Sequence, residues 1–253
     1  MKFVFDLDGT LIFQGQPLSA GIIEGLERLT AHGHEVIFAS ARPIRDMLPV
    51  LDKRFHRGVL IGGNGSLIAQ GGRVVHAESF EPRQLARLLR LIEDHRCRYL
   101  IDGDWDYTYT GPGDHPILRN LDPHGLARNL PLTELNPIVK ILLLAIEDEA
   151  GFRTELAGFD VVVHEHKHEN MLDINPPGIH KWSALQKIGV RPRDFVAFGN
   201  DANDISMFRF ARHGVMIGSH PDLAPYAAES IPLGSGTERM ITAKMEELGA
   251  RYA

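Results

Sequence analysis

The first ten residues place the strongest constraint on the fold. An apolar run at residues 3–5 leads directly into Asp-Leu-Asp-Gly-Thr at residues 6–10. Such a run is typical of a buried parallel strand, and Asp-Gly predicts a turn immediately after it. Asp6 and Asp8 then share one side of the strand's carboxyl end, where open α/β sheets bind ligands. The two carboxylates could bind a hard cation, or act as a nucleophile and a proton donor. An ordinary strand followed by a turn would give the same sequence pattern.

Helix and strand patterns alternate after this strand. Apolar spacing with Ser19 as N-cap and Gly33 as stop predicts the first helix, and Pro43 opens the second. The expected helices are residues 18–31 and 43–51, and the expected strands are 36–39, 59–61, 66–69 and 73–76, the last two forming a hairpin. This order predicts an α/β fold with a Rossmann-like, doubly wound parallel sheet.

The pattern changes near residue 80 and returns near residue 195. In between, helices are expected at residues 82–95 and 148–157, and strands at 98–102, 105–109, 139–146, 159–163 and 171–174. These elements lack βαβ regularity and predict an inserted α+β unit. Strands at 195–198 and 214–217 and helices at 204–211 and 238–248 resume the first pattern. We therefore predict a core of residues 1–81 and 176–253 and an inserted domain of residues 82–175.

Composition narrows the partners of the protein. The net charge is −6 and the basic residues are scattered, so nucleic acid is not expected as a partner. The longest apolar run, residues 141–146, is far too short to span a membrane. A single cysteine, Cys97, and the lack of a signal-peptide pattern fit a cytoplasmic protein. The oligomeric state stays open.

Four polar groups lie at the expected ends of predicted strands. They are residues 6–10, Ser40-Ala41-Arg42, Gly178-Ile179-His180-Lys181, and Gly199-Asn200-Asp201-Ala202-Asn203-Asp204. In this order they resemble the motifs of the haloacid dehalogenase superfamily, most closely the Cof-type (subclass IIB) phosphatases. Members of that subclass carry a C2-type α+β cap between the second and third motifs. The resemblance therefore implies a Rossmann-like catalytic core and identifies residues 82–175 as a cap that sets substrate specificity.

The resemblance gives the first group its roles. It implies that Asp6 is the nucleophile that forms an aspartyl-phosphate. Asp8 would protonate the leaving alcohol and later activate water, while its backbone carbonyl helps to hold Mg²⁺. Gly9 and Thr10 would contact the phosphate.

The second group suggests a phosphate-binding turn. By resemblance, Ser40 and Ala41 bind phosphate with a hydroxyl and free backbone amides, although the family usually has Gly where Ala41 stands. Ser40 could equally be a simple N-cap. Arg42 is a candidate for substrate binding, with a surface position as the alternative.

The third group contributes one lysine. A lone lysine is usually a solvated surface residue. The position of Lys181 after the insertion matches the family's Gly-(Val/Ile)-x-Lys pattern. The resemblance implies that Lys181 bridges the nucleophile and the phosphoryl group, and a cation there offsets the charge of the transferring group.

The fourth group supplies metal ligands and departs from the family pattern. By resemblance, Mg²⁺ is held by Asp6, Asp8, Asn200 and Asp204, and Asn203 contacts the substrate. The family usually has Asp where Asn200 stands. An amide oxygen can still bind the ion, but one negative charge is lost, so weaker magnesium binding is expected. Asp201 is a less suitable substitute because it is displaced by one residue.

Several further residues are candidates for substrate contact. Asn64-Gly65 matches a turn that Cof-type members carry near the substrate, although a plain tight turn explains it equally well. The polar and aromatic candidates in the predicted cap are Asp102, Asp104, Trp105, Tyr107, Tyr109 and residues 164–169. His164, His166 and His168 would share one face of a strand and could bind a metal, but a solvated edge is the simpler interpretation.

The leading hypothesis is a Mg²⁺-dependent phosphatase that hydrolyses small phosphorylated metabolites, especially sugar phosphates. Two alternatives remain open. A phosphomutase of the phosphomannomutase type shares these motifs and would require a bisphosphate activator. A catalytically weak metabolite-binding relative would explain Asn200 and would bind ligands without releasing phosphate.

Overall fold

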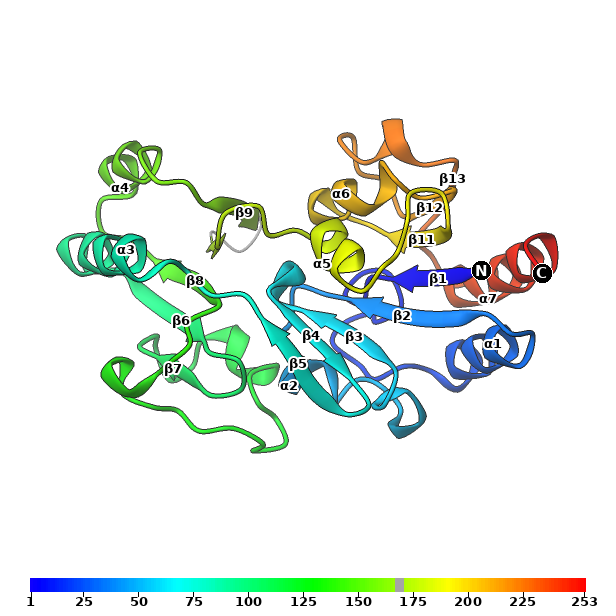
Figure 1. Ribbon diagram of the computed structural model, residues 1–253, viewed down its shortest axis with the longest axis horizontal. Helices are drawn as coiled ribbons and strands as arrows, with labels where there is room; N and C mark the ends of the chain where they lie inside the picture. The colour runs from blue at the N-terminus through cyan, green and yellow to red at the C-terminus, as the bar shows by residue number, and fades with distance from the viewer. Residues whose placement is uncertain (167–170) are drawn as a thin grey trace.

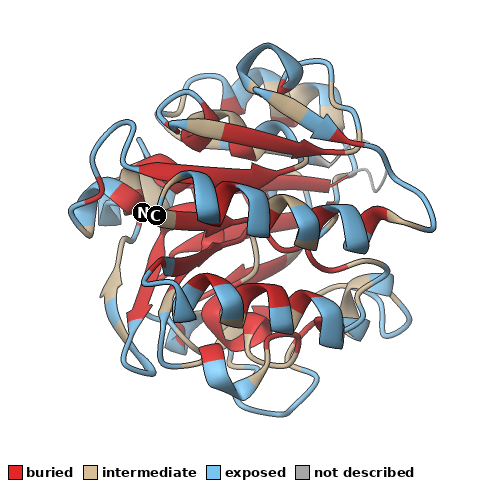
Figure 2. Cartoon of the chain, turned by 90° about the vertical axis from the view of Figure 1, so that its right-hand side faces the viewer, coloured by how far each residue is buried: buried red, intermediate tan, exposed pale blue. Residues whose placement is uncertain are grey.

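The computed structural model describes residues 1–166 and 171–253, and it contains two β-sheets (Figure 1). Both termini lie together at the end of the larger part that is farthest from the smaller sheet (Figures 1 and 2). The chain passes from the larger sheet to the smaller one after β5 (Arg73–Ala77) and returns after β10 (Met171–Asn175).

The larger sheet has eight strands in the order β13-β12-β11-β1-β2-β3-β4-β5. Its other strands are β1 (Lys2–Phe5), β2 (Glu35–Ala39), β3 (Val59–Gly62), β4 (Leu67–Gln70), β11 (Phe195–Gly199), β12 (His213–Ile217) and β13 (Glu229–Ile231). The strands from β13 to β3 pair in parallel, and β4 and β5 extend the sheet as an antiparallel hairpin. The α/β class predicted from the sequence is confirmed.

Helices cover both faces of this sheet. They are α1 (Ala20–Ala31), α2 (Ile44–Met47), α5 (Lys181–Lys187), α6 (Ile205–Phe208) and α7 (Thr237–Arg251). Phe3 and Phe5 of β1 pack into one apolar cluster with α1 and α7, whereas Val4 packs into a second with α5 and α6. Because successive strand side chains alternate between faces, an uninterrupted apolar run fills both layers. Figure 2 shows the buried strands between helices whose outer faces are exposed.

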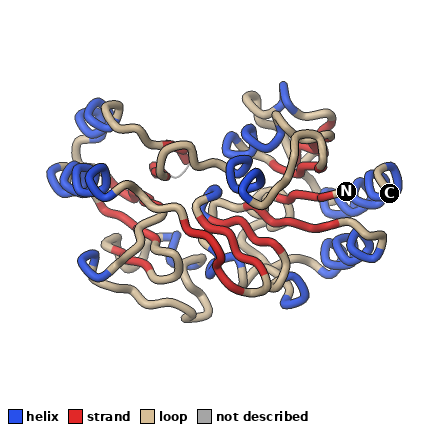
Figure 3. The backbone as a smooth tube through the Cα atoms, in the orientation of Figure 1, coloured by secondary structure: helices blue, strands red, loops and turns tan. Residues whose placement is uncertain are grey.

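The smaller sheet is antiparallel throughout, with the strand order β7-β6-β8-β10-β9. It contains β6 (Arg98–Asp102), β7 (Tyr107–Tyr109), β8 (Lys140–Ala145), β9 (Val162–His166) and β10, with helices α3 (Pro82–Asp94) and α4 (Glu149–Leu156). Leu88 of α3 and Phe152 of α4 are fully buried in the apolar cluster of this sheet. Figure 3 shows the two helices together beside these strands.

Several predicted elements have different bounds in the structure. Helix α2 ends at Met47 rather than near residue 51, because Pro49 lacks the N–H that would continue the helical hydrogen bonds. Strand β9 begins at Val162 rather than at residue 159, since Phe159 still hydrogen-bonds to Leu156 in the turn after α4. Strand β7 and helix α6 are shorter than predicted, and β13 was not predicted.

The histidine hypothesis falls partly outside the described residues. β9 is an edge strand of the smaller sheet, and the Cα of His164 is paired with that of Asp173 on β10. Position 168 lies outside residues 1–166 and 171–253, so a face built from His164, His166 and His168 stays a prediction.

Candidate active site

The carboxyl end of β1 carries a buried acid. The backbone N–H of Asp6 donates to the carbonyl of Phe198 on β11 at 2.9 Å, which fixes Asp6 between two strand ends. Its side chain is almost completely buried, and Oδ2 accepts a 2.9 Å hydrogen bond from the Thr10 hydroxyl. Gly9 makes this tight turn possible because its φ of 79° lies in the left-handed region. The first sequence group therefore folds around Asp6.

Lys181 is the first residue of α5, and its side chain contacts Asp6. Its Nζ lies 2.6 Å from Asp6 Oδ1 and 2.6 Å from Asp204 Oδ1, and the lysine is fully buried. We refer to Asp6, Lys181 and Asp204 as the tip cluster. Burial raises the pKa of Asp6 to about 7, although Lys181 acts in the opposite direction. Burial disfavours the charged lysine, but Asp204 and Asp6 outweigh it and raise the pKa of Lys181, which stays protonated.

Asp204 also holds the loop after β11 in place. Its Oδ2 accepts the backbone N–H groups of Asn200 at 2.8 Å and Asp201 at 3.1 Å, while Oδ1 faces Lys181. A Cβ at position 199 would lie 2.5 Å from Asp204 Oδ2, so this close approach requires Gly199. Both carboxylate oxygens of Asp204 are engaged within the protein, and its assignment as a direct metal ligand stays a prediction.

The Asn200 carboxamide lies close to Asp6 and to the backbone carbonyl of Asp8, and these three groups can each offer an oxygen to a metal ion. The outer end of the Asn200 carboxamide lies 3.1 Å from Asp6 Oδ2, from the backbone carbonyl oxygen of Asp8 and from Thr10 Oγ1. Neighbouring ligands in an octahedral magnesium shell with bonds of about 2.1 Å lie about 3 Å apart. Among residues 1–166 and 171–253, no three His, Cys, Asp or Glu side chains gather as a metal site. A carboxylate, a backbone carbonyl and an amide oxygen nevertheless fit Mg²⁺.

The second sequence group lies at the carboxyl end of β2, as predicted. Ser40 is buried, and its Oγ accepts the backbone N–H of Arg42 at 3.1 Å. The Arg42 guanidinium donates to both carboxylate oxygens of Asp8, at 2.6 and 2.7 Å. The Asp8 side chain is half exposed, whereas Arg42 is mostly covered. Arg42 is therefore not a surface residue, and it holds Asp8 beside the turn at Ser40.

Asn64 connects the core to the smaller sheet. Its φ of 59° places it in a left-handed turn, and its Nδ2 donates to Asp173 Oδ2 and Asn175 Oδ1, both at 3.1 Å. Asn203 donates to Asn64 Oδ1 at 3.3 Å. Gly65 is required because a Cβ there would lie 2.6 Å from the His180 carbonyl. The predicted substrate residues Asn64, Gly65 and Asn203 therefore lie together.

Two residues beside the site, Lys140 and Asp173, were not predicted from the sequence. Lys140 Nζ lies 2.8 Å from Asp173 Oδ2 and donates to the carbonyl of Ala41 at 2.9 Å, so a strand of the smaller sheet contacts the Ser40 turn. Both residues are buried. The sequence did offer a signal for both. Lys140 directly precedes the apolar run 141–146, and Asp173 lies within the predicted buried strand 171–174, where charged residues are unusual.

Arg45 makes a second buried connection between the sheets. It is almost fully buried, its Nη2 lies 2.5 Å from Asp102 Oδ1, and Nη1 donates to the Trp105 carbonyl at 2.8 Å. Asp46 accepts the backbone N–H of Asp122 at 2.9 Å. Burial raises the pKa of Asp46 to about 6. We refer to five residues as the boundary cluster, namely Arg45, Asp46, Asp102, Lys140 and Asp173.

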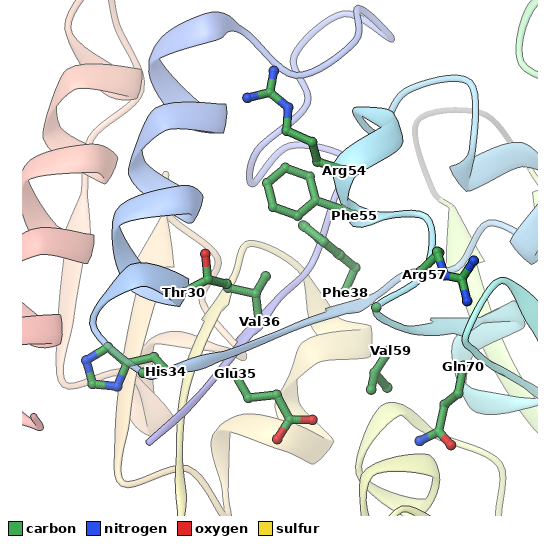
Figure 4. Close-up of a pocket in the computed structure, with 12 residues that line it drawn as sticks. Thr30, His34, Glu35, Val36, Phe38, Arg54, Phe55, Arg57, Val59 and Gln70 are labelled. Atoms are coloured by element: carbon green, nitrogen blue, oxygen red, sulfur yellow. The ribbon is translucent and has the colours of Figure 1, made fainter.

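One pocket lies away from these residues. It has a volume of about 530 Å³ and is lined by Val36, Val59 and Phe55, with Arg54 and Arg57 nearby (Figure 4). Val36 and Val59 lie near the amino ends of β2 and β3, opposite the end that carries Asp6. Open α/β sheets bind ligands at the carboxyl ends of their strands, so we place the active site at Asp6.

No helix within the described residues is both long enough and apolar enough to cross a membrane. A family model described as haloacid dehalogenase-like hydrolase matches residues 3–232. An HMP-PP phosphatase from Cronobacter sakazakii is 28% identical over 232 residues, which cover 85% of this chain and 83% of that protein. A 5-amino-6-(5-phospho-D-ribitylamino)uracil phosphatase from Bacillus subtilis is 24% identical, with 86% of each chain covered.

Solved structures share the fold along nearly the whole chain. A haloacid dehalogenase-like hydrolase from Bacteroides thetaiotaomicron superimposes with a TM-score of 0.78 at 22% identity, covering 98% of each chain. The subclass IIB sugar phosphatase BT4131 gives a TM-score of 0.76 at 18% identity, also with 98% of each chain covered. At these identities the structural likeness shows the fold.

Proposed function

Because the chain belongs to the haloacid dehalogenase-like hydrolases, we propose that its acidic site hydrolyses a small phosphorylated metabolite through a covalent intermediate on Asp6. The chain is a phosphatase of the Cof type. One observation carries the proposed reaction. Asp6 is a buried carboxylate at a strand end, held by Lys181 on one oxygen and by Thr10 on the other.

The reaction proceeds in two displacements. A carboxylate oxygen of Asp6 attacks phosphorus, and the bond from phosphorus to the alcohol oxygen breaks as that oxygen takes a proton from Asp8. Water then attacks phosphorus in the aspartyl-phosphate, Asp8 accepts its proton, and phosphate leaves with the Asp6 carboxylate restored. In the structure Asp8 is paired with Arg42, so substrate binding must replace this ion pair before Asp8 can act.

The surrounding residues stabilise the negative charge of the phosphoryl group. Lys181 faces Asp6 as a fixed cation, and the Ser40 turn supplies the Ser40 hydroxyl and the backbone N–H of Ala41. Gly9 and Thr10 line the same turn as Asp6. Mg²⁺ held by Asp6, the carbonyl of Asp8 and Asn200 would neutralise phosphoryl oxygens when it is bound.

We propose that residues 82–175 form a cap that selects the substrate, while residues 1–81 and 176–253 perform the chemistry. Lys140 and Asp173 extend from this segment to the Ala41 carbonyl and Asn64, close to the predicted phosphate turn. The relatives are named for HMP-PP and for a phosphorylated ribityl compound, and one structural neighbour is a sugar phosphatase. We propose a sugar phosphate or related phosphomonoester as substrate, hydrolysed in the cytoplasm.

The test is phosphate release from a panel of phosphomonoesters, with and without Mg²⁺, for the wild type and Asp6→Asn. We expect release that depends on magnesium and falls by at least about 10,000-fold in Asp6→Asn, because the amide is not a nucleophile. Circular dichroism would establish that the variant is folded. Equal release from both proteins would contradict the aspartyl-phosphate, and no release from any ester would contradict the proposed function.

A further inference from the structure

The Asn200 carboxamide occupies a position surrounded by hydrogen-bond acceptors. With its nitrogen toward them, it donates to Asp6 Oδ2 and to the carbonyl of Asp8, each at 3.1 Å. Thr10 Oγ1 lies at the same distance. The Thr10 hydroxyl donates to Asp6 Oδ2 at 2.9 Å, and with the amide oxygen facing it the hydroxyl can donate to Asn200 Oδ1 at 3.1 Å instead. A carboxamide N–H₂ group therefore suits this position within the protein itself.

The turn around Gly9 is shaped to admit this amide. A Cβ at position 9 would lie only 2.2 Å from the outer atom of the Asn200 carboxamide that points away from Asp6, and 3.0 Å from its Cγ. Any side chain at position 9 would therefore displace the carboxamide. The backbone turn and the amide fit each other closely, independently of the hydrogen bonds.

The same position is where a cation would meet its ligands. Asp6 Oδ2 and the Asp8 carbonyl are two of the three oxygens that fit Mg²⁺, and the Asn200 oxygen is the third. Rotation of the carboxamide by about 180° about its last side-chain bond exchanges nitrogen for oxygen at this point, a change that an sp³–sp² torsion allows. Asparagine can therefore donate hydrogen bonds when no cation is present and offer its oxygen when a cation binds, whereas an ionised aspartate can only accept hydrogen bonds or bind the cation.

Charge adds a second difference between asparagine and aspartate. When Asp6 is ionised, Asp6, Asp8 and Asp204 are opposed by Lys181 and Arg42, so three carboxylates against two cations leave one net negative charge. An aspartate at position 200 would raise this to two. A divalent cation would be attracted more strongly to the second arrangement, while the cation-free site would suffer more repulsion.

We propose that the Asn200 carboxamide is an internal substitute for the divalent cation in this site. Without a metal, its N–H groups hydrogen-bond to the Asp6 carboxylate and the Asp8 carbonyl and hold them together. When Mg²⁺ binds, the carboxamide rotates about its last side-chain bond and presents its oxygen to the ion. Cation binding must then displace these hydrogen bonds, so asparagine lowers the affinity for Mg²⁺ and keeps the site assembled in its absence. This inference rests on the metal position in the proposed function.

The test compares Asn200→Asp with the wild type, and with Ala202→Asp as a matched control. The control adds the same charge at an exposed position, the first residue of the short 3₁₀ helix Ala202–Asp204. Isothermal titration calorimetry with MgCl₂ into EDTA-treated protein gives the affinity, and thermal melts in EDTA and in MgCl₂ give the stability. Asn200→Ala is measured in parallel because it removes both the donor and the ligand.

For Asn200→Asp we expect magnesium affinity to rise by at least about tenfold and the melting temperature in EDTA to fall by about 5 °C. Saturating Mg²⁺ should remove that deficit. Asn200→Ala should melt lower in EDTA without gaining affinity, and it tests the proposal if Asn200→Asp does not fold. Wild-type affinity and wild-type melting in Asn200→Asp, or equal effects from Ala202→Asp, would overturn the proposal.

These measurements need no turnover, so they separate the inference from the proposed function. Magnesium binding that responds to residue 200, in a protein that releases no phosphate, would support the inference and contradict the phosphatase reaction. Magnesium-dependent phosphate release together with an affinity that is indifferent to residue 200 would do the reverse.

Discussion

The tip cluster and the boundary cluster are both buried groups of charges, but they differ in what assembles them. Asp6 follows β1 and Asp204 follows β11, both strands of the larger sheet, and Lys181 begins α5, which packs on that sheet. In the boundary cluster, Arg45 and Asp46 belong to α2 beside the larger sheet, while Asp102, Lys140 and Asp173 belong to strands of the smaller one. One cluster depends on a single sheet, and the other exists only where two sheets meet.

This difference separates chemistry from positioning. Neighbouring parallel strands bring their carboxyl ends to one edge, so the tip cluster is assembled however long the insertion between its members is. The boundary cluster instead links the smaller sheet to the Ser40 turn through Lys140 and the Ala41 carbonyl. We therefore expect changes in the tip cluster to affect folding and turnover together, and changes in the boundary cluster to affect how the cap sits on the core.

The largest effect is expected from Lys181→Met. This change leaves two buried carboxylates, Asp6 and Asp204, without their shared cation, and should lower the free energy of unfolding by about 3–5 kcal/mol. Lys187→Met is the control, because Lys187 lies on the same helix but is partly exposed in its ion pair with Glu78. The control should change stability by less than about 1 kcal/mol, measured by urea unfolding. Similar losses in both variants would refute the central role of the buried lysine.

A smaller effect is expected from the pH dependence of Asp46. Its folded pKa of about 6 lies above the ordinary value of 3.8, so the folded state favours the protonated form. The stability gained at low pH should therefore be lost as the pH rises from about 4 to about 6, by about 3 kcal/mol in total. Asp46→Asn keeps an oxygen for the Asp122 N–H and should remove this part of the decline, while the part caused by the raised pKa of Asp6 remains.

The measurement is the free energy of unfolding at several pH values between about 3 and 7, the range that brackets both pKa values. Asp52→Asn is a suitable control, because hydrogen bonds from Arg54 lower the pKa of the exposed Asp52. Its replacement should not flatten the decline that the wild type shows. If Asp46→Asn retains the full decline, another group is responsible for it.

The smallest effect is expected from the paired change Lys140→Met with Asp173→Asn. Removing both charges avoids an unpaired buried ion, and the amide oxygen that replaces the Asp173 carboxylate can still accept from Asn64. The Ser40 turn loses its anchor at the Ala41 carbonyl, so kcat/KM should fall by about tenfold, which is about 1.4 kcal/mol.

Steady-state kinetics and urea unfolding of the double variant would test this separation of roles. Lys140→Met alone should be less stable than the double variant, because it leaves the buried Asp173 carboxylate without its lysine. An unchanged kcat/KM in the double variant would mean that the contact at Ala41 does not position the phosphate turn.

The sequence was informative wherever local pattern and topology act together. The apolar runs of β1, β2 and β11 identified the buried strands, and the polar residues after them lie at one edge of the sheet. It failed where a single residue ended an element, as Pro49 does for α2, or where a turn delayed a strand, as Phe159 does for β9. Such boundaries depend on a few backbone contacts that periodicity does not record.

The sequence by itself determined the order of the elements and the edge on which Asp6, Ser40 and Asn200 lie, because strand direction follows from chain connectivity. Only the tertiary structure decided how these side chains are paired. It placed Asp204 against Lys181 and the loop N–H groups, and Asp8 against Arg42. It also joined Lys140 to the Ala41 carbonyl across the two sheets. These pairings depend on distances between segments far apart in the chain, which no local pattern specifies.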